Sequence, residues 1–305
     1  MADKSAIEWT DATWNPVTGC SKVSPGCAHC YAETISLRFG RSAKPWTPEN
    51  AAENVVLHPD RLYQPLRWRR PRMVFVNSMS DLFHEEIPDG YIDDVFAVMA
   101  AARRHTFQVL TKRPERAREW FASWVSTFST ADRVDALAWE IEPRGAKMNV
   151  WPLPNVWLGV SIENARYTWR ADVLREIPAA VRFISAEPLL GTLVNVRDRI
   201  GRMAMNARLI PRDLEIARAV ARSIPKPLDL TGIDWLIVGG ESGAHARPMR
   251  IEWARELRDA CLLADAPAPA FFFKQWGGRT PKAGGRELDG RTWDEMPTER
   301  QAVLA

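Results

Sequence analysis

The sequence has no long apolar run. Apolar stretches such as residues 97–102 and 268–273 are far shorter than the roughly 20 residues of a membrane-spanning helix. The amino terminus, Met1-Ala-Asp-Lys-Ser5, has no apolar signal region. We therefore expect a cytoplasmic protein that does not associate with membranes.

The excess of positive over negative charge is also small. The formal net charge is +3 over 305 residues, so the chain as a whole offers little electrostatic attraction for nucleic acid. There is neither an internal repeat nor a low-complexity linker. Any site for a polyanion must therefore be local.

Cysteine is rare, but its placement is uneven. Of the 4 cysteines, three fall in the run Cys20-Ser-Lys-Val-Ser-Pro-Gly-Cys27-Ala-His-Cys30. In a reducing compartment such closely spaced cysteines are typical of metal ligands rather than disulfides. The run therefore predicts a metal site.

Three thiolates leave more than one kind of site open. A structural zinc normally takes four protein ligands, whereas a four-iron cluster on three cysteines keeps one iron free for a small molecule. Cys261 or one of the 5 histidines could complete a zinc site, although His29 is expected to turn its ring away. A catalytic iron–sulfur site, a structural zinc and free thiols remain alternatives on spacing alone.

Short β-branched and aromatic runs alternate with longer amphipathic stretches. Helices are expected at residues 91–104 and 253–263. The order of strand then helix predicts an α/β fold, a partial or complete parallel β/α (TIM-like) barrel of about six to seven strands. We expect a single domain over residues 1–305 with helical insertions at about 120–154 and 192–232. The predicted strands are residues 13–19, 73–78, 106–111, 156–161, 181–185, 235–240 and 270–274.

Polar clusters follow nearly every predicted strand. Each could simply cap the next helix, but in a β/α barrel the carboxyl ends of all strands meet at one rim, where active sites lie. We expect these clusters to converge with the three cysteines. They are Asn77-Ser-Met-Ser-Asp81, Thr111-Lys112-Arg113, Ser161-Ile-Glu163-Asn164, Ser185-Ala-Glu187-Pro188, Gly239-Gly-Glu241-Ser242 and Lys274-Gln275.

Taken together, these stretches resemble the radical S-adenosylmethionine superfamily. The likeness is closest to a phage- and prophage-associated group of uncharacterised radical-SAM-like proteins with a three-cysteine motif. It rests on Trp14-Asn-Pro-Val-Thr-Gly-Cys20, Ser24-Pro-Gly-Cys27-Ala-His-Cys30-Tyr-Ala32, Val76-Asn-Ser-Met-Ser-Asp81, Leu110-Thr-Lys-Arg-Pro114, Leu158-Gly-Val-Ser-Ile-Glu-Asn164, Ile184-Ser-Ala-Glu-Pro188, Val238-Gly-Gly-Glu-Ser-Gly243 and Phe273-Lys-Gln-Trp276.

The resemblance implies a cofactor and a reaction class. It implies a [4Fe-4S] cluster on Cys20, Cys27 and Cys30, with S-adenosylmethionine on the fourth iron as the source of a 5'-deoxyadenosyl radical. The superfamily usually has C-x3-C-x2-C with an aromatic before the third cysteine, whereas this chain has C-x6-C-x2-C with His29 there. The Gly-Gly-Glu that commonly follows the second strand is here on the sixth, at residues 239–241. Cluster binding is thus supported more directly than cofactor cleavage.

Roles for the polar residues follow from this interpretation. We expect the substrate to be oriented by four residues at the strand ends. The alternative for Glu163 is an ion pair with Lys112 or Arg166 that braces the rim. The expected catalytic residues are Asp81, Lys112, Glu187 and Glu241, and the expected cofactor-binding residues are Asn77, Ser161, Glu163, Asn164 and Ser185.

The expected partners are a reductant protein for the cluster, a genetically linked protein and a nucleic-acid or nucleotide-derived substrate. The alternative function is a zinc- or cluster-stabilised module that binds nucleic acid or a partner without radical catalysis. For a nucleic-acid substrate, the decisive cations are expected at the rim, in Lys112, Arg113 and Lys274. The run Arg61-Leu-Tyr-Gln-Pro-Leu-Arg-Trp-Arg-Arg-Pro-Arg72 could bind phosphates and stack bases. It precedes a strand, at the amino end of the barrel, so we interpret it as a solvated or structural basic face.

Overall fold

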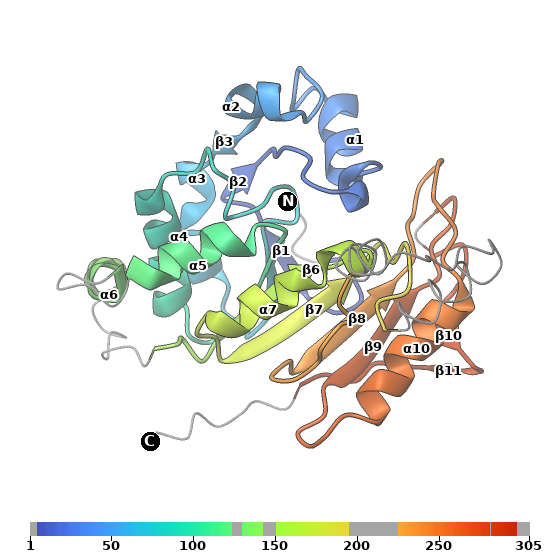
Figure 1. Ribbon diagram of the computed structural model, residues 1–305. Coiled ribbons are helices and arrows are strands. Elements are labelled where there is room, and N and C mark those ends of the chain that lie inside the picture. The colour runs from blue at the N-terminus through green and yellow to red at the C-terminus, as the bar shows by residue number, and fades with distance from the viewer. Residues whose placement is uncertain (1–4, 124–129, 143–150, 195–224, 281, 298–305) are drawn as a thin grey trace, which may run out of the picture.

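A computed structural model describes residues 5–123, 130–142, 151–194, 225–280 and 282–297. Its centre is an all-parallel seven-stranded sheet with the order β1-β4-β5-β6-β7-β8-β9, curled into a half-barrel (Figure 1). The predicted partial parallel β/α barrel is confirmed. The strands are β1 (Ala12–Trp14), β4 (Met73–Val76), β5 (Thr106–Thr111), β6 (Val156–Ser161), β7 (Val181–Ala186), β8 (Trp235–Gly239) and β9 (Ala270–Gln275).

Helices pack on one face of this sheet. Alternate strand residues, among them Val74, Val109 and Val238, are fully buried in one core together with residues of the helices. The helices on this face are α4 (Asp89–Ala101), α5 (Pro114–Ala122), α7 (Trp169–Glu176) and α10 (Ile251–Leu262). The helices predicted at residues 91–104 and 253–263 correspond to α4 and α10. Each begins two residues before the predicted start and ends before the predicted end.

The opposite face of the sheet carries an aromatic cluster at the amino-terminal half of the strands. The ring of Trp235 lies 5.8 Å from that of Phe183 and 5.9 Å from that of Trp157. Gly159 makes room for this cluster, because a Cβ there would stand 2.5 Å from the ring of Phe183. Apolar packing therefore fills the amino end of this face, and polar residues are left for the carboxyl end.

The first predicted strand, residues 13–19, is wrong as a single element. After β1 the chain leaves the sheet, and β2 (Val17–Thr18) pairs antiparallel with β3 (Val56–Leu57). Pro16 lacks the N–H that a ladder needs. The side chain of Asn15 instead accepts the N–H of Met79, and Asn77 Oδ1 accepts the N–H of Val17.

Shorter elements complete the chain. Within the predicted insertions, α6 (Thr130–Ile141) packs on α4, while residues 124–129, 143–150 and 195–224 lie outside the described part. Among the helices that the structure describes, none is long and apolar enough to cross a membrane. The remaining described elements are α1 (Tyr31–Arg38), α2 (Ala51–Asn54), α3 (Pro59–Leu62), β10 (Glu287–Leu288), β11 (Arg291–Thr292) and the short 3-10 turns η1 (Pro25–Cys27), η2 (Pro48–Asn50), η3 (Gln64–Arg67) and η5 (Ala165–Tyr167).

The outer edge of β9 is covered by the segment that follows β11. The N–H of Phe273 donates to the carbonyl of Trp293 at 2.9 Å, and Phe272 forms an antiparallel bridge with Asp294. The N–H of Phe271 donates to the carboxylate of Glu295 at 3.0 Å. Backbone groups of this edge strand are thus satisfied within the chain.

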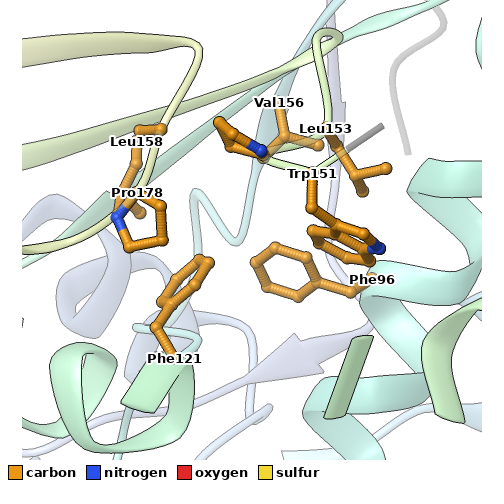
Figure 2. A pocket seen from close by; sticks show the side chains of 9 residues that line it. Phe96, Phe121, Trp151, Leu153, Val156, Leu158 and Pro178 are labelled. Atoms are coloured by element: carbon orange, nitrogen blue, oxygen red, sulfur yellow. The ribbon is translucent and has the colours of Figure 1, made fainter. Parts of the chain in front are cut away.

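A small apolar pocket lies between α4, α5 and the start of β6 (Figure 2). Phe96 and Phe121 come from the helices, and Trp151 and Leu153 come from the segment before β6. All nine lining residues are apolar, so this pocket brings together no group for acid–base or metal chemistry. The candidate functional site lies elsewhere.

Candidate functional site

The three cysteines lie on the loop of residues 19–30 between β2 and α1, here called the cysteine loop. Gly19 starts it beside the carboxyl end of β4, where its N–H donates to the carbonyl of Met79 at 2.9 Å. A side chain at Gly19 would overlap the carbonyl of Asn54, and its φ is +87°. The loop then passes through the turn Pro25–Cys27 and ends at Cys30, the N-cap residue of α1.

Cys20, Cys27 and Cys30 are half-buried free thiols. Among the described residues, no three His, Cys, Asp or Glu side chains stand close enough together to hold a metal ion. Cys261 is buried in the core on α10, apart from the loop. His29 Nδ1 lies 3.1 Å from Glu241 Oε2, so its ring is engaged by that carboxylate.

The guanidinium of Arg113 lies against the first cysteine. Its Nη1 donates to Cys20 Sγ at 3.5 Å, and its Nη2 donates to Ser21 Oγ at 2.9 Å and to the carbonyl of Ser21 at 3.1 Å. Burial raises the pKa of Cys20 to about 12, although the charge of Arg113 lowers it. A metal bound here would therefore displace a proton from Cys20, and Arg113 would stabilise the thiolate.

Asp81 and Glu85 hold Arg113 in place. Arg113 Nε donates to Glu85 Oε2 at 2.9 Å, and its Nη1 lies 3.4 Å from Asp81 Oδ2. Asp81 also accepts Thr111 Oγ1 at 2.7 Å and the N–H of Lys112 at 2.9 Å. The carboxylate of Asp81 is therefore committed to the neighbouring strand end, which suits a positioning residue better than a substrate contact.

Glu163, at the end of β6, holds the cysteine loop from a second side. Its Oε1 accepts the N–H of Gly26 at 3.3 Å, and its Oε2 lies 3.1 Å from Arg170 Nη1. The side chains of Glu163 and Arg170 are 0% and 2% exposed. The expected alternative of an ion pair with Lys112 or Arg166 is wrong in its partner, because Arg170 projects from α7 to this carboxylate.

Glu241, after β8, forms a third contact with the loop. Arg247 Nε donates to Glu241 Oε2 at 2.9 Å, and Arg247 Nη2 donates to the carbonyl of Pro25 at 3.0 Å. Burial acts to raise the pKa of Glu241, but hydrogen bonds from Arg247 and His29 outweigh it and lower the pKa to about 2. Glu241 is therefore an anion that binds both His29 and Arg247. Since Arg247 also binds the carbonyl of Pro25, Glu241 is connected to the loop before and after Cys27.

With this geometry in view, comparison with known proteins places the chain in a family. The model described as "Protein of unknown function (DUF5131)" matches residues 4–297. The chain belongs to the DUF5131 family. No curated protein and no solved structure matches it.

The other predicted cofactor-binding residues of this DUF5131 protein lie at or just after the ends of β4, β6 and β7. Ser161 and Ser185 are paired across β6 and β7, and Ser161 Oγ donates to the carbonyl of Glu187 at 3.3 Å. Asn164 Oδ1 accepts the N–H of Arg166 at 3.0 Å, so it caps the turn Ala165–Tyr167. Asn77 is buried, and among the described residues its Nδ2 has no hydrogen-bond partner.

The three cations expected at the rim differ in their availability. Arg113 is buried by the contacts above, so its proposed contact with a nucleic-acid substrate is wrong. Lys274 Nζ lies 2.6 Å from Glu187 Oε1. Lys274 and Glu187, which were both expected to contact the substrate, therefore form an ion pair with each other. The half-buried side chain of Lys112 has no hydrogen bond or ion pair with a described residue. Burial raises the pKa of Cys30, and among the opposing influences is the charge of Lys112.

Sequence reasoning missed the residues that hold the loop. Arg170 and Arg247 come seven and six positions after the glutamates that they bind, with no motif to mark them. His84 was missed as well; its Nε2 lies 2.9 Å from Ser21 Oγ, and its Nδ1 accepts the N–H of Glu86. Burial lowers the pKa of His84, with Arg113 adding to the effect, so the neutral ring is favoured.

Proposed function

We propose that this DUF5131 protein binds a [4Fe-4S] cluster through Cys20, Cys27 and Cys30 and uses it with S-adenosylmethionine. When bound, this cofactor pair supplies a 5'-deoxyadenosyl radical that abstracts hydrogen from a substrate. The proposed substrate is a nucleic acid or a nucleotide-derived molecule. A reductant protein and a genetically linked protein are the proposed partners.

The observation that carries the proposal is the setting of the three cysteines. They share one loop at the carboxyl ends of a parallel half-barrel, and Arg113 Nη1 lies 3.5 Å from Cys20 Sγ. Three cysteines on a four-iron cluster leave one iron without a protein ligand. Fixed donors near cluster sulfurs tune such centres, so a buried guanidinium beside Cys20 suits this chemistry.

The chain's own residues divide into two groups in this proposal. Asp81, Glu163 and Glu241 keep the cysteine loop in position through arginines and main-chain N–H groups. Lys112 and the Nδ2 of Asn77, which have no hydrogen-bond partner among the described residues, are the proposed contacts for the carboxylate and the hydroxyl groups of S-adenosylmethionine. Binding at the cluster and orientation of the cofactor are thus assigned to different residues.

The test is anaerobic reconstitution with matched cysteine variants. The parent protein is expected to hold about four iron and four sulfide per chain. Cys27→Ala should lose most of the iron, whereas Cys261→Ala should keep it, because Cys261 is a core residue on α10. Stoichiometric zinc without sulfide, or equal iron loss in both variants, contradicts the proposal. The zinc result favours a binding module without turnover.

A second measurement separates cofactor cleavage from cluster binding alone. The reduced, clustered protein is expected to form 5'-deoxyadenosine from S-adenosylmethionine, slowly, even without substrate. A full cluster with no such product would leave the radical reaction unsupported and the cluster assignment intact.

A further inference from the structure

Six arginines gather at the amino ends of two neighbouring strands, far along the sheet from the cysteine loop. One segment precedes β4 and the other precedes β5, and these strands are paired with Met73 opposite Thr106. The N–H of Thr106 donates to the carbonyl of Arg72 at 2.9 Å, so the segments lie side by side. The arginine patch consists of Arg67, Arg69, Arg70, Arg72, Arg103 and Arg104.

Contacts within the patch fix its backbone. The guanidinium of Arg104 donates to the carbonyl of Trp68 at 2.8 Å and to that of Leu66 at 2.6 Å. The guanidinium of Arg72 lies 5.0 Å from the ring centroid of Trp68, and this buried ring packs edge-on against His105 at 5.7 Å. The segment before β4 is therefore held in one conformation, which lowers the entropy cost of binding a ligand.

Three arginines of the patch carry charge that no described side chain neutralises. Arg67, Arg69 and Arg70 are exposed, and no described carboxylate lies within ion-pairing distance of them. Neither segment contains an acidic residue. Because the patch contributes six positive charges to a chain of net charge +3, the rest of the chain is net negative. Positive charge is thus concentrated at one end of the half-barrel.

We propose that the arginine patch binds the phosphate backbone of a nucleic acid, without regard to sequence. The planar guanidinium matches phosphate oxygens in pairs, and the patch contains arginine but no lysine. Of the exposed large apolar side chains of the described chain, only Tyr63 lies in the run 61–72 and none lies beside Arg103 and Arg104, which leaves little apolar surface for insertion into a lipid surface. The inference goes beyond the proposed function, because the patch and the cysteine loop lie at opposite ends of the strands.

This assignment revises the interpretation of the basic run as a solvated face. From the sequence, the run 61–72 stood alone before one strand. The pairing of β4 with β5 adds Arg103 and Arg104 to it, from about thirty positions later in the chain. Because two segments contribute to the patch, its guanidinium groups are spread over a surface. They can therefore contact several phosphates of a nucleic acid backbone.

The test compares two triple variants that remove the same charge. Arg67→Gln/Arg69→Gln/Arg70→Gln changes the patch, and Arg38→Gln/Arg41→Gln/Arg279→Gln changes three other exposed arginines. Fluorescence anisotropy with labelled duplex and single-stranded DNA is measured over a range of salt concentrations. The patch variant is expected to reduce the slope of log K against log salt for duplex by roughly 2–3, because each lost phosphate contact removes about 0.9. The control should keep the slope of the parent.

Three results would overturn the inference. They are no binding of DNA or RNA by the parent, an equal fall in slope for both triple variants, and binding to vesicles of anionic lipid that is tighter than binding to DNA. As a control for folding, the patch variant should have the same midpoint temperature of thermal unfolding as the parent. Iron content and 5'-deoxyadenosine formation are measured on the same samples, so failure of this inference is distinguished from failure of the proposed function.

Discussion

The carboxylate of Glu163 accepts a hydrogen bond from the main-chain N–H of Gly26, although the two residues are 137 positions apart. Gly26 immediately precedes Cys27, so the end of β6 holds the turn that presents the second cysteine. A Cβ at Gly26 would stand 3.3 Å from the carboxyl carbon of Glu163, which makes glycine the residue that fits most easily. The other oxygen of Glu163 faces Arg170.

Glu163→Ala is expected to destabilise the protein by about 3–5 kcal/mol, because it leaves the buried charge of Arg170 without its partner. The measurement is the free energy of unfolding in urea. Glu176→Ala is the matched control, since its pair with Arg118 is exposed and should cost less than about 1 kcal/mol.

The double variant Glu163→Ala/Arg170→Met should recover part of that loss, because it removes the unpaired charge. If Glu163→Ala instead unfolds at the parent's urea midpoint and only weakens binding of S-adenosylmethionine, Glu163 is a cofactor ligand and its positioning role is refuted.

Lys112→Ala is expected to leave the unfolding free energy within about 0.5 kcal/mol of the parent, since the side chain has no polar partner among the described residues. If Lys112 binds the cofactor carboxylate, the affinity for S-adenosylmethionine should fall roughly tenfold or more. Isothermal titration of the clustered protein measures it. Lys112→Arg keeps the charge and should retain most of the affinity; an unchanged affinity in Lys112→Ala would remove this lysine from the site.

Glu241 gives a prediction for acid pH. Its pKa in the folded protein is about 2, below the ordinary value of 4.5, so its ionised form stabilises the fold above pH 4.5. That contribution is lost as the pH falls from 4.5 towards 2. Unfolding free energies of the metal-free parent should therefore fall more steeply over this range than those of Glu241→Gln. Parallel pH profiles for the two proteins would show that Arg247 does not stabilise the carboxylate.

Sequence periodicity predicted the sheet because buried parallel strands are continuous apolar runs. The runs that became β5, β6 and β7 match the expected strands at both ends or within one residue. The first strand was predicted too long because Val17 and Thr18 continue a β-rich run after Pro16. Pro16 is the local sign of this break, whereas the hydrogen bond of Val17 with Asn77, sixty positions away, is one that no local pattern reports.

The same limit applies to the site. The carboxyl ends of parallel strands share a rim, so Asp81, Glu163 and Glu241 could be placed near the cysteines from topology alone. Which of them contacts a ligand and which holds the loop depends on where arginines reach from α7 and from the segment after β8. Guanidinium groups at the end of long side chains can meet many carboxylates, and sequence spacing does not select among them.

The covered edge of β9 has a consequence for handling the protein. A half-barrel has two open edges, and an uncovered edge strand such as Phe271-Phe272-Phe273 would offer free N–H and carbonyl groups beside three aromatic rings. The segment at Trp293–Glu295 occupies those groups. A chain that ends before residue 290 would leave the phenylalanine-rich edge strand β9 unpaired. Such a truncation is expected to aggregate through strand addition.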